Sequence, residues 1–170
     1  MIRYQMIILD IDGTMTDGKI YIDSNGIESK CFNVKDGMAI SQAKSIGYNI
    51  VFFTARVSTI VEIRAKELGI NDVYQGIKNK KDKLIEIAKA NNVRLEEIVY
   101  IGDDLNDLEV MGLVGFCACP IDACIEIKEK SNFVSTYRGG DGAVREIIEF
   151  LLKKQGEWNK IVEKFKHINQ

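Results

Sequence analysis

An apolar run that leads directly into two carboxylates is the feature of this sequence best suited to chemistry. Met6–Leu9 is apolar, and Asp10-Ile-Asp12 follows it. A short apolar run that ends in turn residues is typical of a buried strand in a parallel sheet. Extended backbone points residues i and i+2 the same way, so we expect the Asp10 and Asp12 side chains to converge. Converging carboxylates are unfavourable unless a cation or a proton lies between them.

The same Asp-x-Asp-Gly pattern also occurs in calcium-binding loops and in ordinary turns. A calcium loop that began at Asp10 would need a glutamate at its twelfth position, where this chain has Tyr21. We therefore discount a calcium loop. An ordinary turn stays open on these residues alone, and the choice depends on the residues downstream.

Polar residues also follow two later apolar runs. Ile50–Phe53 leads into Thr54 and Arg56, and Ile98–Ile101 leads into Gly-Asp-Asp-Leu-Asn-Asp. Lys80 lies between these runs, in a lysine-rich segment. In doubly wound sheets, ligands bind at the carboxyl ends of the strands, so we expect these groups to gather at one edge.

This set of side chains suits phosphoryl transfer. Enzymes accelerate phosphate monoester hydrolysis by up to about 10²¹-fold, or roughly 28 kcal/mol, so several groups must cooperate. Our interpretation is that Asp10 attacks phosphorus and forms an aspartyl-phosphate, while Asp12 protonates the leaving alcohol and then activates water. We expect Mg²⁺ to bridge Asp10, the phosphate and Asp103. Thr54 and Lys80 would hold the phosphate oxygens.

The chain alternates strand-like runs with helical patterns. This alternation predicts a single α/β domain over residues 1–170, with a Rossmann-like, doubly wound and mostly parallel sheet. The expected strands are Met6–Leu9, Ile50–Thr54, Val73–Tyr74, Ile98–Ile101, Gly115–Ala118 and Phe133–Val134. The expected helices are one ending at Ser45, one opened by a Thr59-x-x-Glu62 capping box, one ending at Ala90, Asp122–Lys130, one capped by Asp141 and ending at Lys153, and Glu157–Gln170.

A hairpin is expected to protrude from the sheet near its catalytic edge. Asn25-Gly26 lies between two strand-like segments, which predicts a hairpin over residues 18–33. A two-stranded hairpin is only marginally stable alone, so its apolar residues should pack on the domain or on a neighbouring subunit. The same two alternatives hold for the C-terminal helix 157–170. The apolar hairpin residues are Ile20, Ile22, Ile27 and Phe32.

Composition narrows the function classes. A chain of 170 residues with 46% hydrophobic residues suits one domain with a full core. The net charge of −2 and the lack of a basic block argue against nucleic acid as a partner. We find no apolar stretch of membrane-spanning length and no features of a signal peptide, and therefore expect a cytoplasmic protein without a membrane partner. The four cysteines form no C-x-x-C pair, which predicts free thiols rather than a zinc site.

Four motifs in order resemble those of the haloacid dehalogenase superfamily. They are Leu-Asp-Ile-Asp-Gly-Thr at residues 9–14, Thr54, Lys80, and Gly-Asp-Asp-Leu-Asn-Asp at residues 102–107. The resemblance implies that Asp10 is the nucleophile, Asp12 the acid/base and Asp103 a ligand of Mg²⁺. It also implies that the Asp12 backbone carbonyl binds the metal. We expect Asp107 to support the metal shell and leave the supporting role of Asp104 open.

Within that superfamily, the chain resembles the 3-deoxy-D-manno-octulosonate 8-phosphate phosphatases from Met6 to about Gln155. The segments that carry this resemblance are Asp17–Tyr21, Phe32–Gly37, Tyr74–Gly76, Tyr100–Asp104 and Gly139–Glu146. The resemblance implies a sugar acid phosphate substrate, a role in lipopolysaccharide precursor synthesis, and no cap domain. It also implies a homotetramer in which hairpins form a central barrel and neighbouring subunits shield each site. The implied substrate contacts are Asp12, Asn33, Val34, Lys35, Asp36, Gly37, Arg56, Arg64 and Lys80.

Three departures from that family bear on the substrate. The family commonly has arginine where this chain has Lys35 and Ser41, and lysine does not bind a carboxylate bidentately as arginine does. Ala55 also replaces the glycine that is usual before Arg56. A nonulosonate 9-phosphate is therefore an alternative substrate. Some phosphatases for such sugars carry an acidic residue where Arg56 stands, so Arg56 favours the eight-carbon acid.

Two other functional classes fit this sequence less well. A signalling receiver domain has an acidic pair near its start and its acceptor aspartate on a middle strand, which is the reverse of the order here. A non-catalytic tetramerising phosphatase-like module would often lack motif residues, whereas this chain keeps Asp10, Asp12, Lys80 and Asp103. Single residues also have simpler explanations. A lysine run is usually a solvated face, Arg56 and Arg64 could form surface ion pairs, and Thr54 could be an ordinary strand residue.

Overall fold

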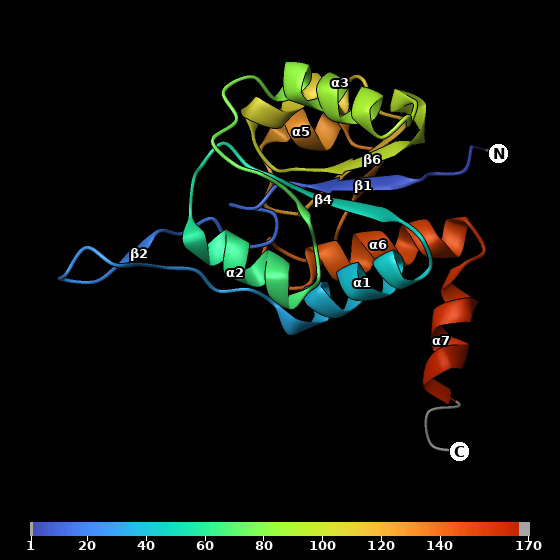
Figure 1. The fold of residues 1–170 in the computed structure, drawn as a ribbon, viewed down its shortest axis with the longest axis horizontal. Coiled ribbons are helices and arrows are strands. Elements are labelled where there is room, and N and C mark those ends of the chain that lie inside the picture. The colour runs from blue at the N-terminus through green and yellow to red at the C-terminus, as the bar shows by residue number, and fades with distance from the viewer. Residues whose placement is uncertain (1, 167–170) are drawn as a thin grey trace.

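A six-stranded parallel sheet forms the centre of the computed structural model, which describes residues 2–166 (Figure 1). The strand order is β5-β4-β1-β6-β7-β8, and every neighbouring pair is parallel. This confirms the predicted doubly wound α/β fold. The strands are β1 (Met6–Leu9), β4 (Asn49–Phe53), β5 (Asp72–Tyr74), β6 (Ile98–Ile101), β7 (Phe116–Cys119) and β8 (Phe133–Val134).

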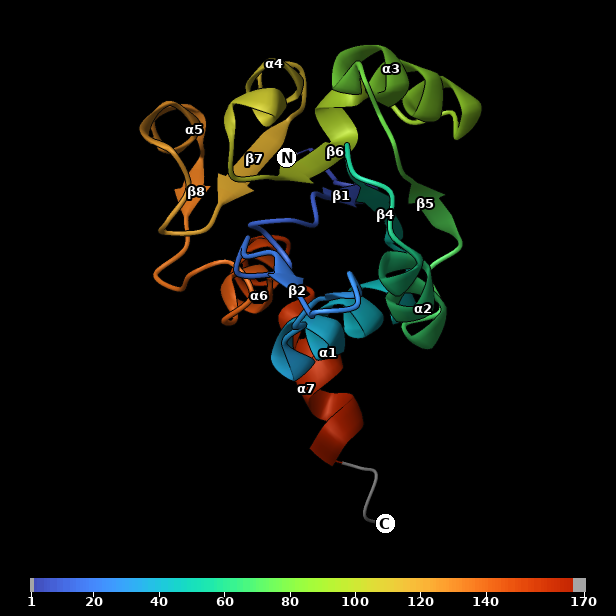
Figure 2. The ribbon, with the colours of Figure 1, turned by 90° about the vertical axis from the view of Figure 1, so that its left-hand side faces the viewer.

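Helices cover both faces of this sheet (Figures 1 and 2). One face carries α1 (Val34–Ser45), α2 (Thr59–Glu67) and α6 (Ala143–Lys154). The other carries α3 (Lys80–Ala90), α4 (Leu108–Met111) and α5 (Ile125–Lys130). Two 3₁₀ turns, Leu95–Glu97 and Leu105–Asp107, lie on either side of β6. Within residues 2–166, no helix has the length and apolar character needed to cross a bilayer.

The central strand β1 explains why an unbroken apolar run precedes the carboxylates. Its side chains alternate between two cores. Ile7 and Leu9 face the core on the α1 and α6 side, whereas Met6 and Ile8 face the core on the α3 side. Strands buried on both faces need apolar residues at every position. Leu9 pairs with Phe52 of β4 and with Ile101 of β6, so the residues that follow these three strands meet at one edge.

The predicted hairpin is present but has short strands. It consists of β2 (Tyr21–Ile22) and β3 (Glu28–Ser29), which pair antiparallel and project from the body of the protein (Figure 1). Three residues close the turn, and Gly26 adopts φ +77°, which is typical of a type I turn followed by a bulge. Ile20, Ile22 and Ile27 are exposed, whereas Phe32 packs against the core.

The N-terminal ends of two helices differ from the sequence prediction. The predicted Thr59 capping box is wrong, because Ser58 is the N-cap and Thr59 the first helical residue. The side chain of Gln75 holds the Ser58 N–H at 2.8 Å, which fixes Ser58 in extended backbone. Asp141 does not cap α6 either, since its N-cap is Gly142 at φ +105°.

Several other bounds move by a few residues. The helix expected from Asp122 begins at Ile125, because Asp122 instead accepts a hydrogen bond from the Gly139 N–H at 3.0 Å. Strand β7 begins at Phe116 rather than Gly115, and β4 spans Asn49–Phe53, one residue earlier than expected. The four cysteines are free, as predicted.

The C-terminal helix α7 spans Trp158–Lys166, and the rest of the predicted helix 157–170 lies outside the described residues. Ile161 is buried and Trp158 packs against the core, so the start of α7 packs on its own domain. Phe165 remains exposed. Packing on its own domain is therefore shown for the start of this helix, and contact with another subunit stays a prediction.

Candidate active site

A cluster of four buried polar side chains lies where β1 and β6 end, and we call it the inner cluster: Asp10, Lys80, Tyr100 and Asp107. The Lys80 ammonium lies 2.6 Å from Asp10 Oδ1 and 2.6 Å from Asp107 Oδ1. The Tyr100 hydroxyl donates to Asp107 Oδ1 at 2.6 Å. The Lys80 side chain is 4% exposed, so this lysine is not part of a solvated face.

Asp107 supports the site rather than opening onto it. Its Oδ1 accepts from Lys80 and Tyr100, and its Oδ2 accepts from the backbone N–H groups of Asp103 (3.0 Å) and Asp104 (3.4 Å). Asp107 therefore holds both the lysine and the turn that carries Asp103. Asp104 begins the following 3₁₀ turn, where its side chain accepts from the Leu105 N–H at 2.8 Å. Tyr100 was missed by sequence reasoning, because nothing distinguishes it from other apolar strand residues.

The Asp103 carboxylate lies against the turn that follows β1 and Asp10. Thr14 Oγ1 donates to Asp103 Oδ1 at 2.9 Å. Gly13 has φ +101°, and a Cβ at that position would lie 2.0 Å from Asp103 Oδ2. Position 13 therefore needs glycine both for its backbone conformation and for the space it leaves. This contact brings the ends of β1 and β6 together.

The inner cluster holds more negative than positive charge. Burial raises the pKa of Asp10 well above its usual range, and Asp107 and Asp103 raise it further, while Lys80 opposes the rise. Burial is also the main cause that raises the pKa of Asp103 to about 7. Burial alone would lower the pKa of Lys80, but Asp10 and Asp107 outweigh it and raise that pKa. The lysine therefore stays charged.

Three carboxylates with one ammonium make a site that fits a divalent cation. Carboxylate oxygens of Asp10, Asp103 and Asp107 lie within 4.8 Å of one another. Carboxylate oxygen is the ligand that Mg²⁺ prefers in proteins, and a second cation would offset the surplus negative charge. Both oxygens of Asp107 already accept hydrogen bonds, so Asp10 and Asp103 are the better placed ligands of the three.

A second group of charged side chains, the outer cluster, surrounds the other predicted catalytic carboxylate: Asp12, Glu28, Lys30 and Arg56. The Lys30 ammonium contacts Asp12 Oδ1 and lies 3.0 Å from Glu28 Oε1. Arg56 Nη2 donates to the same Glu28 oxygen at 3.0 Å, and its Nε lies 3.9 Å from Asp12 Oδ2. The Thr54 hydroxyl lies 3.5 Å from Asp12 Oδ2. The predicted residues Asp12, Thr54 and Arg56 are thus brought together.

Sequence reasoning missed Glu28 and Lys30. Both lie on the returning side of the hairpin, two residues apart, so extended backbone points them the same way. That spacing was the one available signal. It was not enough, because the sequence does not say that the hairpin folds back over Asp12.

The predicted substrate-binding segment Asn33–Gly37 begins helix α1. Asn33 is its N-cap, and its side chain accepts from the Lys35 and Asp36 N–H groups. Asp36 is buried and accepts from the Arg145 N–H of α6 at 2.7 Å, and burial raises its pKa to about 6. Val34 is exposed. Asn33 thus caps α1, and Asp36 joins α1 to α6.

Arg64 packs beneath the same segment. Its guanidinium lies over the Phe32 ring at 5.5 Å, and its Nη2 donates to the Asn33 carbonyl at 3.3 Å. Its Nη1 pairs with Glu67 at 2.8 Å. A Cβ on Gly37 would lie 2.4 Å from Arg64 Nη2, so glycine makes room for the arginine. Since Arg56 and Arg64 both form ion pairs with glutamates, the ion-pair alternative stays open beside a substrate role.

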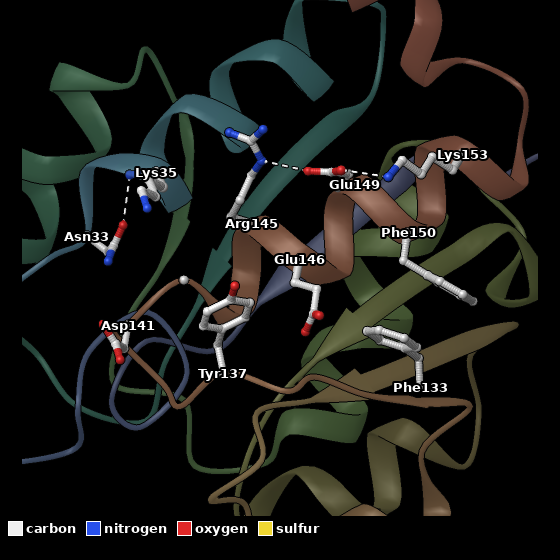
Figure 3. Close-up of a pocket in the computed structure, with 11 residues that line it drawn as sticks. Asn33, Lys35, Phe133, Tyr137, Asp141, Arg145, Glu146, Glu149, Phe150 and Lys153 are labelled. Atoms are coloured by element: carbon white, nitrogen blue, oxygen red, sulfur yellow. Dashed lines mark hydrogen bonds and ion pairs between the residues drawn. The ribbon is translucent and has the colours of Figure 1, made fainter.

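Asn33 and Lys35 also line a groove of about 760 Å³ between the start of α1 and α6 (Figure 3). Arg145, Glu149 and Lys153 form its charged α6 wall, and Arg145 and Lys153 both bond to Glu149. In the described part of the chain, the lining of this groove includes none of the inner or outer cluster residues. The predicted substrate-binding residues Asn33 and Lys35 therefore line a different surface from Asp12, Arg56 and Lys80.

Comparison with known proteins agrees with this geometry. Residues 57–148 match the haloacid dehalogenase-like hydrolase family. The 3-deoxy-D-manno-octulosonate 8-phosphate phosphatase KdsC of Escherichia coli K12 is 38% identical over 153 residues, which cover 90% of this chain and 81% of that protein.

Solved structures give the same result. The 3-deoxy-D-manno-octulosonate 8-phosphate phosphatase of Moraxella catarrhalis, in complex with magnesium, phosphate and KDO, superposes with a TM-score of 0.92 at 36% identity, covering 95% of this chain and 93% of that one. The cobalt-bound deoxy-D-mannose-octulosonate 8-phosphate phosphatase of Haemophilus influenzae gives a TM-score of 0.87 at 32% identity, covering 92% and 91%. The chain therefore belongs to the haloacid dehalogenase-like hydrolases and, within them, to the KdsC phosphatase family.

Proposed function

We propose that this phosphatase hydrolyses 3-deoxy-D-manno-octulosonate 8-phosphate to the free acid and inorganic phosphate, with Mg²⁺ as cofactor. The observation that carries the proposal is the meeting of Asp10, Asp12, Lys80 and Asp103 at one edge of the sheet. Relatives that are similar to this chain over most of its length are named for that substrate. The free acid would enter lipopolysaccharide precursor synthesis.

In the first step, Asp10 acts as the nucleophile. Lys80 holds Asp10 Oδ1 at 2.6 Å, which leaves Oδ2 to attack phosphorus. The bond between phosphorus and the sugar oxygen breaks, and Asp12 gives its proton to that oxygen. The products of this step are the sugar acid and a phosphoryl group on Asp10.

In the second step, Asp12 acts as a base. Its carboxylate takes a proton from water, and the water oxygen attacks phosphorus. Inorganic phosphate leaves, Asp10 is regenerated, and the proton remains on Asp12 for the next cycle. The Thr54 hydroxyl and the Lys80 ammonium donate hydrogen bonds to the phosphate oxygens in both steps.

The carboxylates of Asp10 and Asp103 and the backbone carbonyl of Asp12 would hold Mg²⁺. When bound, the ion offsets the negative charge of the phosphate and of the buried carboxylates. Asp107 keeps Lys80 and the backbone at Asp103 in place and is a supporting residue in this scheme.

We also propose a homotetramer in the cytoplasm, with neighbouring subunits shielding each site. Ile20, Ile22 and Ile27 are between 56% and 64% exposed, and exposed apolar residues gathered on one small element are typical of an interaction surface. Lys35 lines a groove whose described lining includes none of the inner or outer cluster residues, and there it would be available to a neighbouring subunit. Analytical ultracentrifugation tests this part, and a monomer at micromolar concentration would contradict it.

Steady-state phosphate release with Mg²⁺ tests the substrate. We would compare 3-deoxy-D-manno-octulosonate 8-phosphate with nonulosonate 9-phosphates and with common hexose phosphates. Some phosphatases for nine-carbon acids carry an acidic residue where Arg56 stands, so Arg56 favours the eight-carbon acid, which we expect to give the highest kcat/KM. A higher value for a nine-carbon acid would mean that Lys35 and Ser41 belong to a different pocket. No release from any ester would favour the non-catalytic module.

A further inference from the structure

Lys30 has a buried, charged side chain, and burial is unfavourable for an ammonium group. Its side chain is 2% exposed, although it lies at the base of a hairpin whose tip is in solvent. Burying an ammonium is unfavourable unless it is paired. Here it has two partners, Asp12 Oδ1 and Glu28 Oε1. The roles assigned above to Asp12 and Arg56 do not account for this lysine.

Lys30 makes the shortest contact with the Asp12 carboxylate. The Lys30 ammonium is its nearest partner, whereas the Thr54 hydroxyl lies at 3.5 Å and Arg56 Nε at 3.9 Å. Glu28 holds Lys30 on one side and Arg56 on the other. The four side chains carry two negative and two positive charges. Without Lys30, Asp12 and Glu28 would share Arg56, and the Asp12 carboxylate would turn toward the arginine.

We infer that Lys30 is a positioning residue for proton transfer by Asp12. It holds the Asp12 carboxylate in the orientation in which its proton meets the oxygen of the leaving alcohol. As the bond between phosphorus and oxygen breaks, the proton passes from Asp12 to that oxygen, and Lys30 keeps its own protons. The inference rests on the proposed function, because it needs Asp12 as the acid. It assigns a catalytic purpose to the base of the hairpin.

A change of leaving group tests this role. An alkoxide leaves poorly without a proton, whereas p-nitrophenolate leaves without one, so only the sugar ester needs a well-placed acid. The parameter to compare is kcat/KM, which reports the step in which the alcohol leaves. We expect Lys30→Met to lower kcat/KM for 3-deoxy-D-manno-octulosonate 8-phosphate by about 10- to 100-fold. For p-nitrophenyl phosphate we expect a change of less than about threefold.

Two further variants complete the design. Lys19→Met is the matched control, because Lys19 lies near the same hairpin, is 72% exposed and pairs only with the surface residue Asp17 among the described residues. It should leave both values unchanged. Lys30→Arg keeps the charge and should recover part of the lost activity on the sugar ester. Where Lys30→Met does not fold, as judged by circular dichroism, Glu28→Gln loosens the same contact and should show the same selectivity with a smaller loss.

The outcomes separate this inference from the proposed function. Equal losses on both esters, or no loss on the sugar ester, would overturn the positioning role of Lys30 and leave the phosphatase assignment intact. Wild-type protein that releases no phosphate from 3-deoxy-D-manno-octulosonate 8-phosphate would overturn the proposed function, and this inference with it. That result would be visible before any variant is made.

Discussion

The inner and outer clusters lie side by side at one edge of the sheet, yet different parts of the chain build them. The inner cluster comes from the end of β1, from β6 and the 3₁₀ turn after it, and from helix α3, and its Lys80 and Asp107 side chains are 4% and 0% exposed. The outer cluster draws Glu28 and Lys30 from the hairpin, and the Arg56 side chain is 43% exposed. The first is fixed by the core of the domain, and the second depends on a two-stranded insertion.

This difference suggests a division of labour. In the proposed mechanism, the inner cluster acts on the phosphoryl group, which is common to all phosphate esters. The outer cluster then acts on the leaving alcohol, which differs from one substrate to the next. A hairpin can change its residues at little cost to the core, so substrate preference can change while the chemistry at phosphorus is kept. Substitutions in the two clusters should therefore have different consequences.

The largest effect is expected for Lys80→Met in the inner cluster. This variant leaves Asp10 and Asp107 buried without their cation, and such losses cost about 3–5 kcal/mol. Loss of a donor to the transferring phosphoryl group should also lower kcat by at least about 100-fold. Urea unfolding without divalent metal and phosphate release with p-nitrophenyl phosphate measure the two effects.

The adjacent Lys81→Met is the matched control. Lys81 pairs with Glu109 at 2.7 Å, but the two side chains are 41% and 64% exposed. Exposed ion pairs contribute about 0–1 kcal/mol, so both stability and activity should stay near wild type. Equal effects for Lys80 and Lys81 would contradict the importance given to burial in the inner cluster.

A somewhat smaller loss of stability and activity is expected from a change next to residues 13–16, the loop that follows Asp10 of the inner cluster and Asp12 of the outer cluster. Gly139 packs against the backbone of this loop, and a Cβ there would lie 1.8 Å from the Gly13 carbonyl oxygen and 2.9 Å from that of Thr16. Gly139→Ala should push residues 13–16 away from the segment that precedes α6, lower the free energy of unfolding by about 3 kcal/mol and reduce activity on every ester.

Gly156→Ala controls for loss of a glycine as such. Its backbone is left-handed at φ +71°, and a Cβ would meet open space. The variant should cost about 1–2 kcal/mol of backbone strain and leave kcat unchanged. A Gly139→Ala variant with normal activity would show that the loop tolerates displacement and would weaken the account of both clusters.

The smallest expected effect is a change in the pH dependence of stability at Asp36, which is buried. Unlike the inner cluster carboxylates, it has no lysine or arginine side chain bonded to it in the described part of the chain. Burial raises its pKa to about 6, above the value of about 3.9 expected in an unfolded chain. The folded state therefore holds this proton more tightly. Its contribution to stability is complete below pH 4 and is lost as the pH rises through 6.

Asp36→Asn should remove this dependence, since the amide oxygen still accepts from the Arg145 N–H. Relative to wild type, the variant should gain about 1–3 kcal/mol between pH 4 and pH 8. Thermal unfolding of both proteins across this range gives the difference. A difference that does not vary with pH would show that Asp36 is ionised in the folded protein throughout.

Much of this molecule was predictable, because its main signals are local in the sequence. Strand β1 is an unbroken apolar run, because its side chains are buried in the cores on both faces of the sheet. Asp10 and Thr54 follow such a run directly and Asp103 follows one after a single glycine, so predicting the strands also predicted that these residues meet at one edge. The charge and burial of Lys80 were harder to foresee, since a lysine run normally lies in water.

The remaining features depend on contacts between distant segments. Asp141 is of a residue type that often caps helices, yet it does not cap α6. An N–H in the first turn of that helix, that of Arg145, instead donates to Asp36, which lies 109 positions earlier in the chain. Thr59 lost its capping role because Gln75 fixes the residue before it. Lys30 approaches Asp12 only when the hairpin folds back over the turn that follows β1. Local patterns carry no information about such approaches.

The central claim is that Asp10 performs the chemistry at phosphorus, and Asp10→Asn tests it most directly. The substitution keeps the shape of the side chain and an oxygen for Lys80, so circular dichroism should remain that of wild type. With Mg²⁺ and 3-deoxy-D-manno-octulosonate 8-phosphate, phosphate release should fall to background, because an amide oxygen cannot displace the sugar alcohol and form the phosphoryl intermediate. A folded Asp10→Asn protein with wild-type activity would contradict the mechanism.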